Sequence, residues 1–108
     1  TAVHHKINTI TIVMNNKSWG AEKAYQRDFY NQRYIGADID SPPFHKLAEI
    51  YGAKGYHVTE LKNLKEAISD ALVCNKPAVI NVDVDPKALY SFRKDSFKHR
   101  SKWVSKYI

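Results

Sequence analysis

The first half of the chain contains one apolar segment followed by one helical segment. From Ile7 to Met14 the β-branched residues dominate, which predicts a strand. Residues 15–18 break this strand, because Asn tolerates turn geometry. Residues 19–30 contain no Pro and predict a helix that starts soon after the turn, and residues 31–40 are polar and irregular. The pattern therefore predicts a strand, a turn and a helix, followed by a connecting segment.

The second half begins with a predicted helix and a short strand. Ser41 is expected to cap this helix, and Pro42 suits the first helical position. The apolar stripe of the helix follows the spacing i, i+3, i+4, i+7 and consists of Phe44, Leu47, Ala48 and Tyr51. Gly52 then supplies the left-handed residue that ends it. The strand predicted next covers residues 55–58.

A third helix and a third strand complete the pattern. Thr59 is expected to cap the helix, whose predicted buried stripe is Leu61, Leu64, Ile68, Ala71 and Leu72. Asn75 and Pro77 end this helix. Residues 78–84 predict a strong strand.

The order strand, helix, helix, strand, helix, strand predicts an α/β fold with parallel pairing. We expect a partial three-layer fold, with a small parallel sheet of about three strands and flanking helices. Three strands are few for a parallel sheet, which normally needs both faces covered. The first residues, Thr1-Ala-Val-His-His, resemble the end of a helix. Both features lead us to expect that the chain begins inside a larger protein.

Charge divides the chain into two parts. The net charge is +6, and all of the excess lies in residues 86–108, which hold seven of the 17 Lys and Arg and only one acidic residue, Asp95. We expect residues 1–85 to form the folded portion and residues 86–108 to form a basic C-terminal tail. A basic tail suits a polyanionic partner or is simply solvated. The single Cys74 excludes an internal disulfide, and with no secretory signal visible we expect a cytoplasmic protein.

Common catalytic motifs are missing from the sequence. No HExxH, CxxC or glycine-rich phosphate loop is present. Structural or surface roles are therefore expected for Cys74 and for the five histidines, His4, His5, His45, His57 and His99. Asp83 and Asp85 end the last strand, where a role in the turn is favoured over metal binding.

One motif invites a chemical interpretation, the pair Asn15-Asn16 at the carboxyl end of the first strand. Taken alone, two such Asn residues indicate a turn. Open α/β sheets nevertheless bind ligands at these strand ends. An amide oxygen followed by a turn carbonyl suits a hard cation such as Mg²⁺.

With this motif, the sequence resembles the diphosphate-binding domain of thiamine-diphosphate-dependent enzymes, whose signature is GDG, a spacer and a terminal Asn-Asn. The likeness covers nearly the whole chain and agrees in order over several segments. Within the superfamily the chain is most similar to sulfoacetaldehyde acetyltransferase, and acetolactate-synthase-like enzymes share the middle of the pattern. Ser18 stands where Gln is expected, which leaves the substrate open. The segments that carry the likeness are residues 1–5, 15–23, 28–30, 44–55, 76–86, 92–96 and 103–107.

The resemblance implies a cofactor, thiamine diphosphate with Mg²⁺, and a set of site residues. Asn16 would bind Mg²⁺ through its side-chain oxygen, Ser18 would contribute its backbone carbonyl, and Asn15 would support the turn, with Trp19 and Gly20 next in the cofactor-binding segment. No catalytic residue can be assigned, because the activating Glu belongs to a different domain. The Asp of the GDG motif, the second side-chain ligand, is also absent from these 108 residues.

The resemblance therefore implies part of a transferase or lyase that acts on a two-carbon aldehyde or a 2-keto acid, as in the formation of acetyl phosphate and sulfite. We expect the chain alone to be inactive and to bind no cofactor tightly. The alternative is a non-catalytic basic module that holds nucleic acid or a phosphorylated ligand through its tail. Expected partners are the remaining domains of the parent enzyme or a second copy in a homo-oligomer, with nucleic acid less favoured and no membrane. No apolar run approaches the ~20 residues that cross a bilayer.

Overall fold

A computed structural model describes residues 1–90, and these residues divide into two compact units. The first unit comprises residues 1–17 and 40–85, and the second comprises residues 18–39 and 86–90. The predicted tail therefore lies almost entirely outside the described residues. The predicted boundary between residues 85 and 86 stays a prediction.

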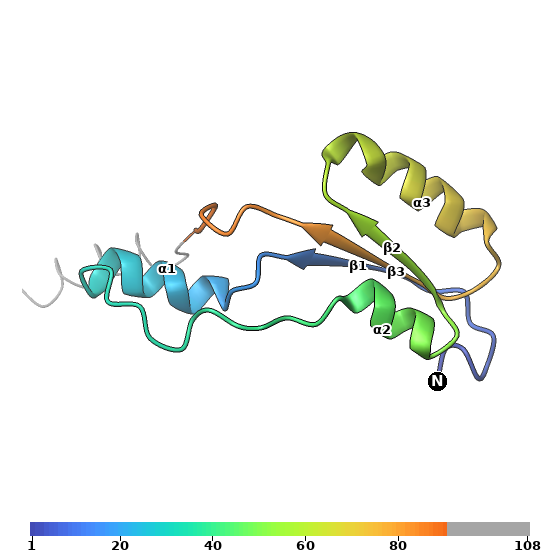
Figure 1. Ribbon diagram of the computed structural model, residues 1–108, viewed down its shortest axis with the longest axis horizontal. Helices are drawn as coiled ribbons and strands as arrows, with labels where there is room; N and C mark the ends of the chain where they lie inside the picture. The colour runs from blue at the N-terminus through green and yellow to red at the C-terminus, as the bar shows by residue number, and fades with distance from the viewer. Residues whose placement is uncertain (91–108) are drawn as a thin grey trace, which may run out of the picture. The chain divides into compact units, whose positions relative to one another are not determined.

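The first unit is built on a parallel sheet of three strands (Figure 1). Its strands are β1 (Ile10–Asn15), β2 (Lys54–Val58) and β3 (Ala78–Asp83), in the order β1-β3-β2. In the register, Ile10 of β1 and Lys54 of β2 both lie opposite Ala78, and Asn15 lies opposite Asp83. The predicted α/β class and the parallel pairing are confirmed, and the last strand in sequence is the central one.

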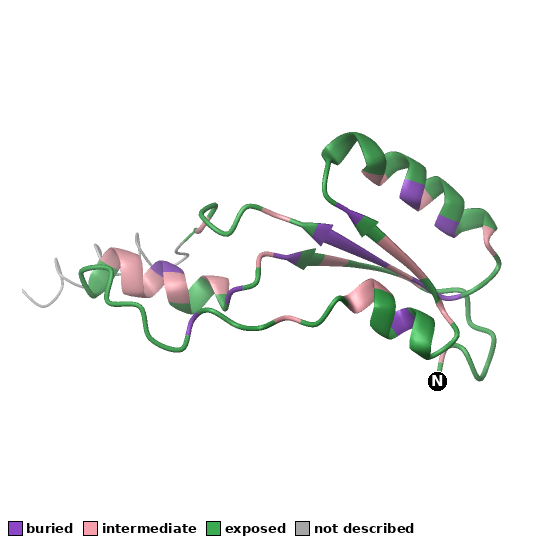
Figure 2. Ribbon diagram, in the orientation of Figure 1, coloured by how far each residue is buried: buried purple, intermediate pink, exposed green. Residues whose placement is uncertain are grey.

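Two helices of this unit, α2 (Phe44–Ile50) and α3 (Leu64–Val73), pack on opposite faces of the sheet. Ala67 and Ala71 of α3 join Ile80 and Val82 of β3 in the apolar core, and Figure 2 shows buried residues concentrated on β3 and on one side of α3. Successive residues of a strand face opposite sides. In β2 and β3 the even-numbered residues face α3, so the odd-numbered residues, such as Gly55 of β2, face α2.

The first helix of this unit, α2, approaches β2 so closely that the strand needs a glycine. A Cβ added at Gly55 would meet the backbone carbonyl of His45 far inside van der Waals contact. The same helix ends as predicted, because Gly52 has φ +85° and Ala53 N–H donates to the carbonyl of Ala48. Together with the bond from Gly52 N–H to the carbonyl of Glu49, this bond forms a Schellman motif, for which Gly is the favoured residue.

The predicted helix caps are wrong. The residue that precedes α2 is Pro43, not Ser41, and no side chain caps the helix. Thr59 caps nothing either, because Glu60 precedes a 3₁₀ turn, η1 (Leu61–Asn63), from which α3 continues without a side-chain cap. In both places the backbone enters the helix through an extended residue without side-chain help.

The predicted apolar stripes are only partly buried. Leu61 and Leu72 are 83% and 70% exposed, whereas Leu64 and Ile68 pack against the core. The 3₁₀ turn at η1 has about three residues per turn, so it shifts Leu61 out of phase with the α-helical stripe. In α2 the buried residue is Ala48, while Leu47 and Tyr51 are exposed.

Residues 2–6 form a hydrogen-bonded turn and no regular helix. Lys6 has φ +54°, its N–H donates to the carbonyl of Val3, and Ile7 N–H donates to the carbonyl of Ala2. This pair of bonds is the Schellman arrangement in which helices end. Residues 2–7 therefore have the hydrogen bonds of a helix C-terminus within a single turn.

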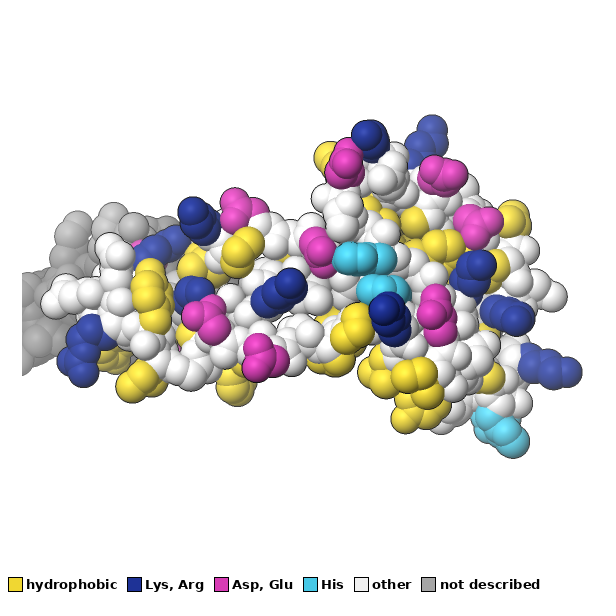
Figure 3. All heavy atoms as spheres, viewed as in Figure 1, with side chains coloured by type: hydrophobic (Ala, Val, Ile, Leu, Met, Phe, Trp, Pro, Cys, Tyr) yellow, Lys and Arg dark blue, Asp and Glu magenta, His cyan; other side chains and the backbone are white. Residues whose placement is uncertain are grey.

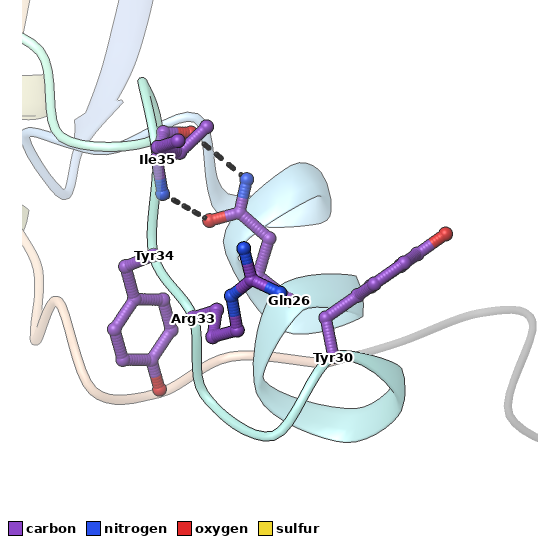
Figure 4. A pocket seen from close by; sticks show the side chains of 5 residues that line it. All are labelled: Gln26, Tyr30, Arg33, Tyr34 and Ile35. Atoms are coloured by element: carbon purple, nitrogen blue, oxygen red, sulfur yellow. Dashed lines mark hydrogen bonds between the residues drawn. The ribbon is translucent and has the colours of Figure 1, made fainter.

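The second unit contains α1 (Gly20–Phe29) and the loop that follows it. Ala24 on α1 and Ala37 in the loop are buried. The side chain of Gln26 forms two hydrogen bonds of 2.9 Å with the backbone of Ile35, as Figure 4 shows for a pocket that Tyr30, Arg33 and Tyr34 also line. Polar contacts to the backbone therefore hold this loop on the helix. Within residues 1–90 the structure has no helix with the length and apolar character that a membrane crossing requires.

Candidate functional site

Asn15, the last residue of β1, is buried and makes two hydrogen bonds with its side chain. Its Nδ2 donates to Oδ1 of Asn81 on β3, at 3.2 Å. Its Oδ1 accepts a hydrogen bond from the backbone N–H of Lys17, at 3.1 Å. The carboxamide thus joins the central strand to the turn that leaves β1.

Asn16 lies between these two anchored positions and is half-buried. Lys17 after it has φ +53°, a left-handed conformation that is uncommon for residues other than Gly. The chain therefore turns at Asn16 within a segment fixed on both sides. A neutral amide oxygen here has the hard-donor chemistry that Mg²⁺ prefers.

Carboxylate and imidazole clusters do not offer a competing metal centre in this part of the chain. Among residues 1–90, no group of three or more His, Cys, Asp or Glu side chains is placed to hold a metal ion. The oxygen donors at the end of β1 are amide and carbonyl groups. This donor set is suitable for Mg²⁺ only when carboxylate and phosphate oxygens from elsewhere complete the coordination shell.

The other predicted site residues, Ser18, Trp19 and Gly20, belong to the second unit. Ser18 is buried, and its hydroxyl donates to a carboxylate oxygen of Asp38 at 3.3 Å. Trp19 exposes most of its side chain, while its backbone N–H donates to the carbonyl of Ala37 at 2.7 Å. Gly20 is the first residue of α1. Within this unit the predicted segment is therefore the junction between the loop and the helix.

Asp38 was missed in the sequence analysis, although it organises this junction. It accepts a hydrogen bond from Ser18 and pairs with the ammonium group of Lys23 on α1. The Lys23 hydrogen bond and charge lower the pKa of the Asp38 carboxyl below its ordinary value. Asp38 lies in an irregular segment with no periodic pattern, so no sequence signal distinguishes it from Asp40.

Asn81 was also missed, and here a signal was present. It is a polar residue between Ile80 and Val82 in the strongest apolar strand of the chain, and it is only 2% exposed. A buried amide is costly unless it is hydrogen-bonded. Its position in the strand therefore pointed to a specific partner, which the structure identifies as Asn15.

Among the described histidines, one arrangement was not indicated by the spacing in the sequence. The rings of His45 and His57 stack with centroids 4.6 Å apart and planes 5° from parallel. Cys74 is half-buried after α3, and its thiol donates to the carbonyl of Ala71 at 3.3 Å. His99 lies outside the described residues.

Comparison with known proteins identifies the family. The model of the C-terminal TPP-binding domain of thiamine pyrophosphate enzymes matches residues 1–82. The chain therefore belongs to this family, and thiamine pyrophosphate is the same cofactor as thiamine diphosphate. The predicted resemblance is confirmed.

Relatives within the family agree with the subgroup likeness. Sulfoacetaldehyde acetyltransferases of Alcaligenes xylosoxydans xylosoxydans and Castellaniella defragrans are each 32% identical over 99% of this chain, which covers 18% and 19% of those proteins. A probable acetolactate synthase large subunit of Methanococcus aeolicus is 27% identical over 84% of this chain, which covers 15% of it. The chain thus spans about a fifth of the length of the curated relatives that match nearly all of it.

A solved structure supports the fold directly. The thiamine diphosphate-dependent 4-hydroxybenzoylformate decarboxylase of Rhodococcus jostii RHA1 is similar with a TM-score of 0.70 and 28% sequence identity. The match covers 78% of this chain and 16% of that one. The three-stranded parallel sheet with flanking helices is therefore part of the thiamine-diphosphate-binding fold.

Proposed function

We propose that this chain supplies one half of the magnesium–diphosphate site of a thiamine-diphosphate-dependent transferase related to sulfoacetaldehyde acetyltransferase. The observation that carries the proposal is the anchored Asn15–Lys17 turn at the carboxyl end of a parallel strand. Parallel sheets bind ligands at this edge, where polar backbone groups end. The substrate would be a two-carbon aldehyde or a 2-keto acid, as the names of the relatives suggest.

In this proposal the chain binds and orients, while the chemistry belongs to the cofactor. Asn16 would hold Mg²⁺ through its side-chain oxygen, and Ser18 would add its backbone carbonyl one residue after Lys17. Asn15 would keep the turn in place, and Trp19 and Gly20 would follow in the cofactor-binding segment. When bound, thiamine diphosphate supplies the stabilised carbanion that breaking a bond next to a carbonyl carbon requires.

The proposal also predicts that residues 1–108 alone bind the cofactor weakly. The four glycines of the sequence stand at positions 20, 36, 52 and 55, so no GDG motif is present to supply the carboxylate ligand. Mg²⁺ gives up its water reluctantly and needs near-octahedral geometry, which one amide and one carbonyl do not provide. Isothermal titration with thiamine diphosphate and Mg²⁺ should show no binding at micromolar concentration, and a micromolar Kd would contradict this part of the proposal.

A chimera tests the positive part. Residues 1–108 would replace the segment to which they align in the Castellaniella defragrans enzyme, and cofactor binding would be measured by titration with and without Mg²⁺. We expect Mg²⁺-dependent binding that Asn16→Ala weakens about 100-fold, or about 3 kcal/mol, because the variant removes one oxygen ligand of the metal. Asn8→Ala, an exposed amide on the same unit, is the matched control. Equal binding by both variants would refute the assignment of Asn16.

Exposed apolar side chains favour the proposal that this chain binds a partner, either other parts of the parent enzyme or a second copy of itself. They lie on α2, on α3 and on β1, and apolar side chains are visible at the surface over α2 (Figure 3). Large exposed apolar patches commonly mark an interface. Sedimentation of the isolated chain should show an oligomer, and a monomer at high concentration would contradict self-association. The residues concerned are Ile12, Met14, Ile50, Tyr51, Leu72 and Val73.

A further inference from the structure

A continuous chain of polar side chains crosses the sheet on the face that α2 covers. Beyond Asn15 and Asn81, it includes Asp83 on β3 and His57 on β2. Nδ2 of Asn81 donates to Oδ1 of Asp83 at 3.0 Å, and Oδ2 of Asp83 contacts Nε2 of His57 at 2.9 Å. These side chains therefore connect all three strands at their carboxyl ends, where the turn after β1 begins.

Burial along this chain changes from one end to the other. Asn81 and Asn15 are buried, whereas the side chains of Asp83 and His57 are each about two-fifths exposed. The ring of His57 also stacks on the ring of His45 of α2. Because Gly55 has no side chain, the backbone of α2 at His45 can lie close to β2. The carboxylate of Asp83 thus lies at the solvated end of this chain of side chains, while the two amides are enclosed.

An ionised carboxylate only accepts hydrogen bonds, and this fixes the direction of every bond after it. Because Asp83 accepts, Asn81 must present its NH₂ group to Asp83 and its oxygen to Asn15. Asn15 must then present its own NH₂ group to Asn81, which leaves its oxygen for the N–H of Lys17. A reversed carboxamide at either position would place two donors against each other.

We propose that Asn81 is a positioning residue for the Asn15–Lys17 turn, and that the carboxylate of Asp83, held by His57, sets the orientation of both buried amides. The purpose of this network rests on the proposed function, since Asn16 in that turn is the suggested Mg²⁺ ligand. Its existence does not, because every contact in it lies within the first unit.

Amide hydrogen exchange of Lys17, measured by NMR on the 108-residue chain without cofactor, tests the proposal. The key variant is Asp83→Asn, which preserves the shape of the side chain but lets it donate as well as accept. We expect Lys17 N–H to exchange at least fivefold faster in this variant and at least tenfold faster in Asn81→Leu. The amide of Ile80 in the central strand reports global opening and should change by less than twofold in Asp83→Asn.

Asn8→Ala is the matched control, since it removes another side-chain bond between two Asn residues, Asn8 Nδ2 to Asn75 Oδ1 at 2.7 Å, away from this network. It should leave Lys17 exchange within twofold of the parent chain. Unchanged Lys17 exchange in Asp83→Asn would overturn the proposal, as would an equal increase at Lys17 and Ile80. If Asn81→Leu does not fold, Asp83→Asn decides alone. No cofactor is present, so a failure to bind thiamine diphosphate in the chimera would refute the function and leave this result standing.

Discussion

The two faces of the small sheet show opposite uses of the same strand. On the face toward α3, β3 contributes Ala78, Ile80 and Val82 to an apolar core. On the face toward α2, the alternate positions Asn81 and Asp83 carry hydrogen-bonding groups toward β1 and β2. Apolar burial is non-directional and supplies most of the stability, whereas hydrogen bonds add less energy but define orientation. The comparison suggests that one face stabilises the unit and the other positions the turn after β1.

The largest effect is expected on the α3 face. Ile80 is fully buried, so Ile80→Ala removes apolar contacts and leaves a cavity. We expect it to lower the free energy of unfolding by about 2–5 kcal/mol. Denaturant unfolding measures this loss, with Leu61→Ala at an exposed position as the control, expected to stay within about 0.5 kcal/mol. Similar losses for both variants would contradict the assignment of stability to the apolar core.

A somewhat smaller effect is expected where α2 contacts the sheet. Gly55→Ala places a methyl group against the carbonyl of His45, so α2 must move away from β2. Overpacking of this kind costs about 1–3 kcal/mol. The same shift should separate the stacked rings of His45 and His57, visible in their NMR signals. Lys46→Ala, at an exposed position of α2, should change neither the free energy of unfolding nor the NMR signals of the two rings. If Gly55→Ala leaves the free energy of unfolding unchanged, α2 and β2 are not tightly packed at this position.

The polar face should respond less in stability than in local order. Asn81→Ala leaves the Nδ2 group of Asn15 and the carboxylate of Asp83 without a partner, which costs about 1–3 kcal/mol. The loss should appear in denaturant unfolding and should stay below that of Ile80→Ala. A larger loss for Asn81→Ala than for Ile80→Ala would reverse the assignment of the two faces.

The smallest effect is expected at the exposed ion pair in the second unit. Lys23 lowers the pKa of Asp38, so the pair adds stability above the pKa that Asp has in the unfolded chain, about 3.9, and this contribution is lost as pH falls through the lower folded value. Lys23→Met should raise the carboxyl pKa of Asp38 toward its ordinary value in an NMR titration. Lys46→Met is the control, and an unchanged Asp38 titration in Lys23→Met would exclude this ion pair as the cause.

Sequence periodicity predicted the elements of the fold better than their ends. All three strands were predicted within a few residues, because β-branched runs such as residues 10–13 favour extended backbone over helix. The caps at Ser41 and Thr59 failed because a cap depends on backbone angles that residue type only favours. The position of Leu61 failed because a 3₁₀ turn changed the helical phase.

The part of the candidate site that is local in sequence could be proposed from the sequence alone. Asn15 and Asn16 could be recognised from the strand end and the family resemblance, and the turn was found there. The partner of Asn15 lies 66 residues away on another strand, and the stacking of His45 on His57 requires the approach of α2. Such contacts depend on tertiary register, which periodicity within one element does not contain.

The position of β3 in the sheet has a consequence for how the chain folds. Because β1 and β2 pair with β3 and not with each other within residues 1–90, neither of these pairings can form until residues 78–83 leave the ribosome. The pairing of Ile10 with Ala78 closes a long loop, and such non-local contacts slow folding. Until then β1 and β2 lack their pairing with β3, and during this interval chaperone binding or aggregation competes with folding.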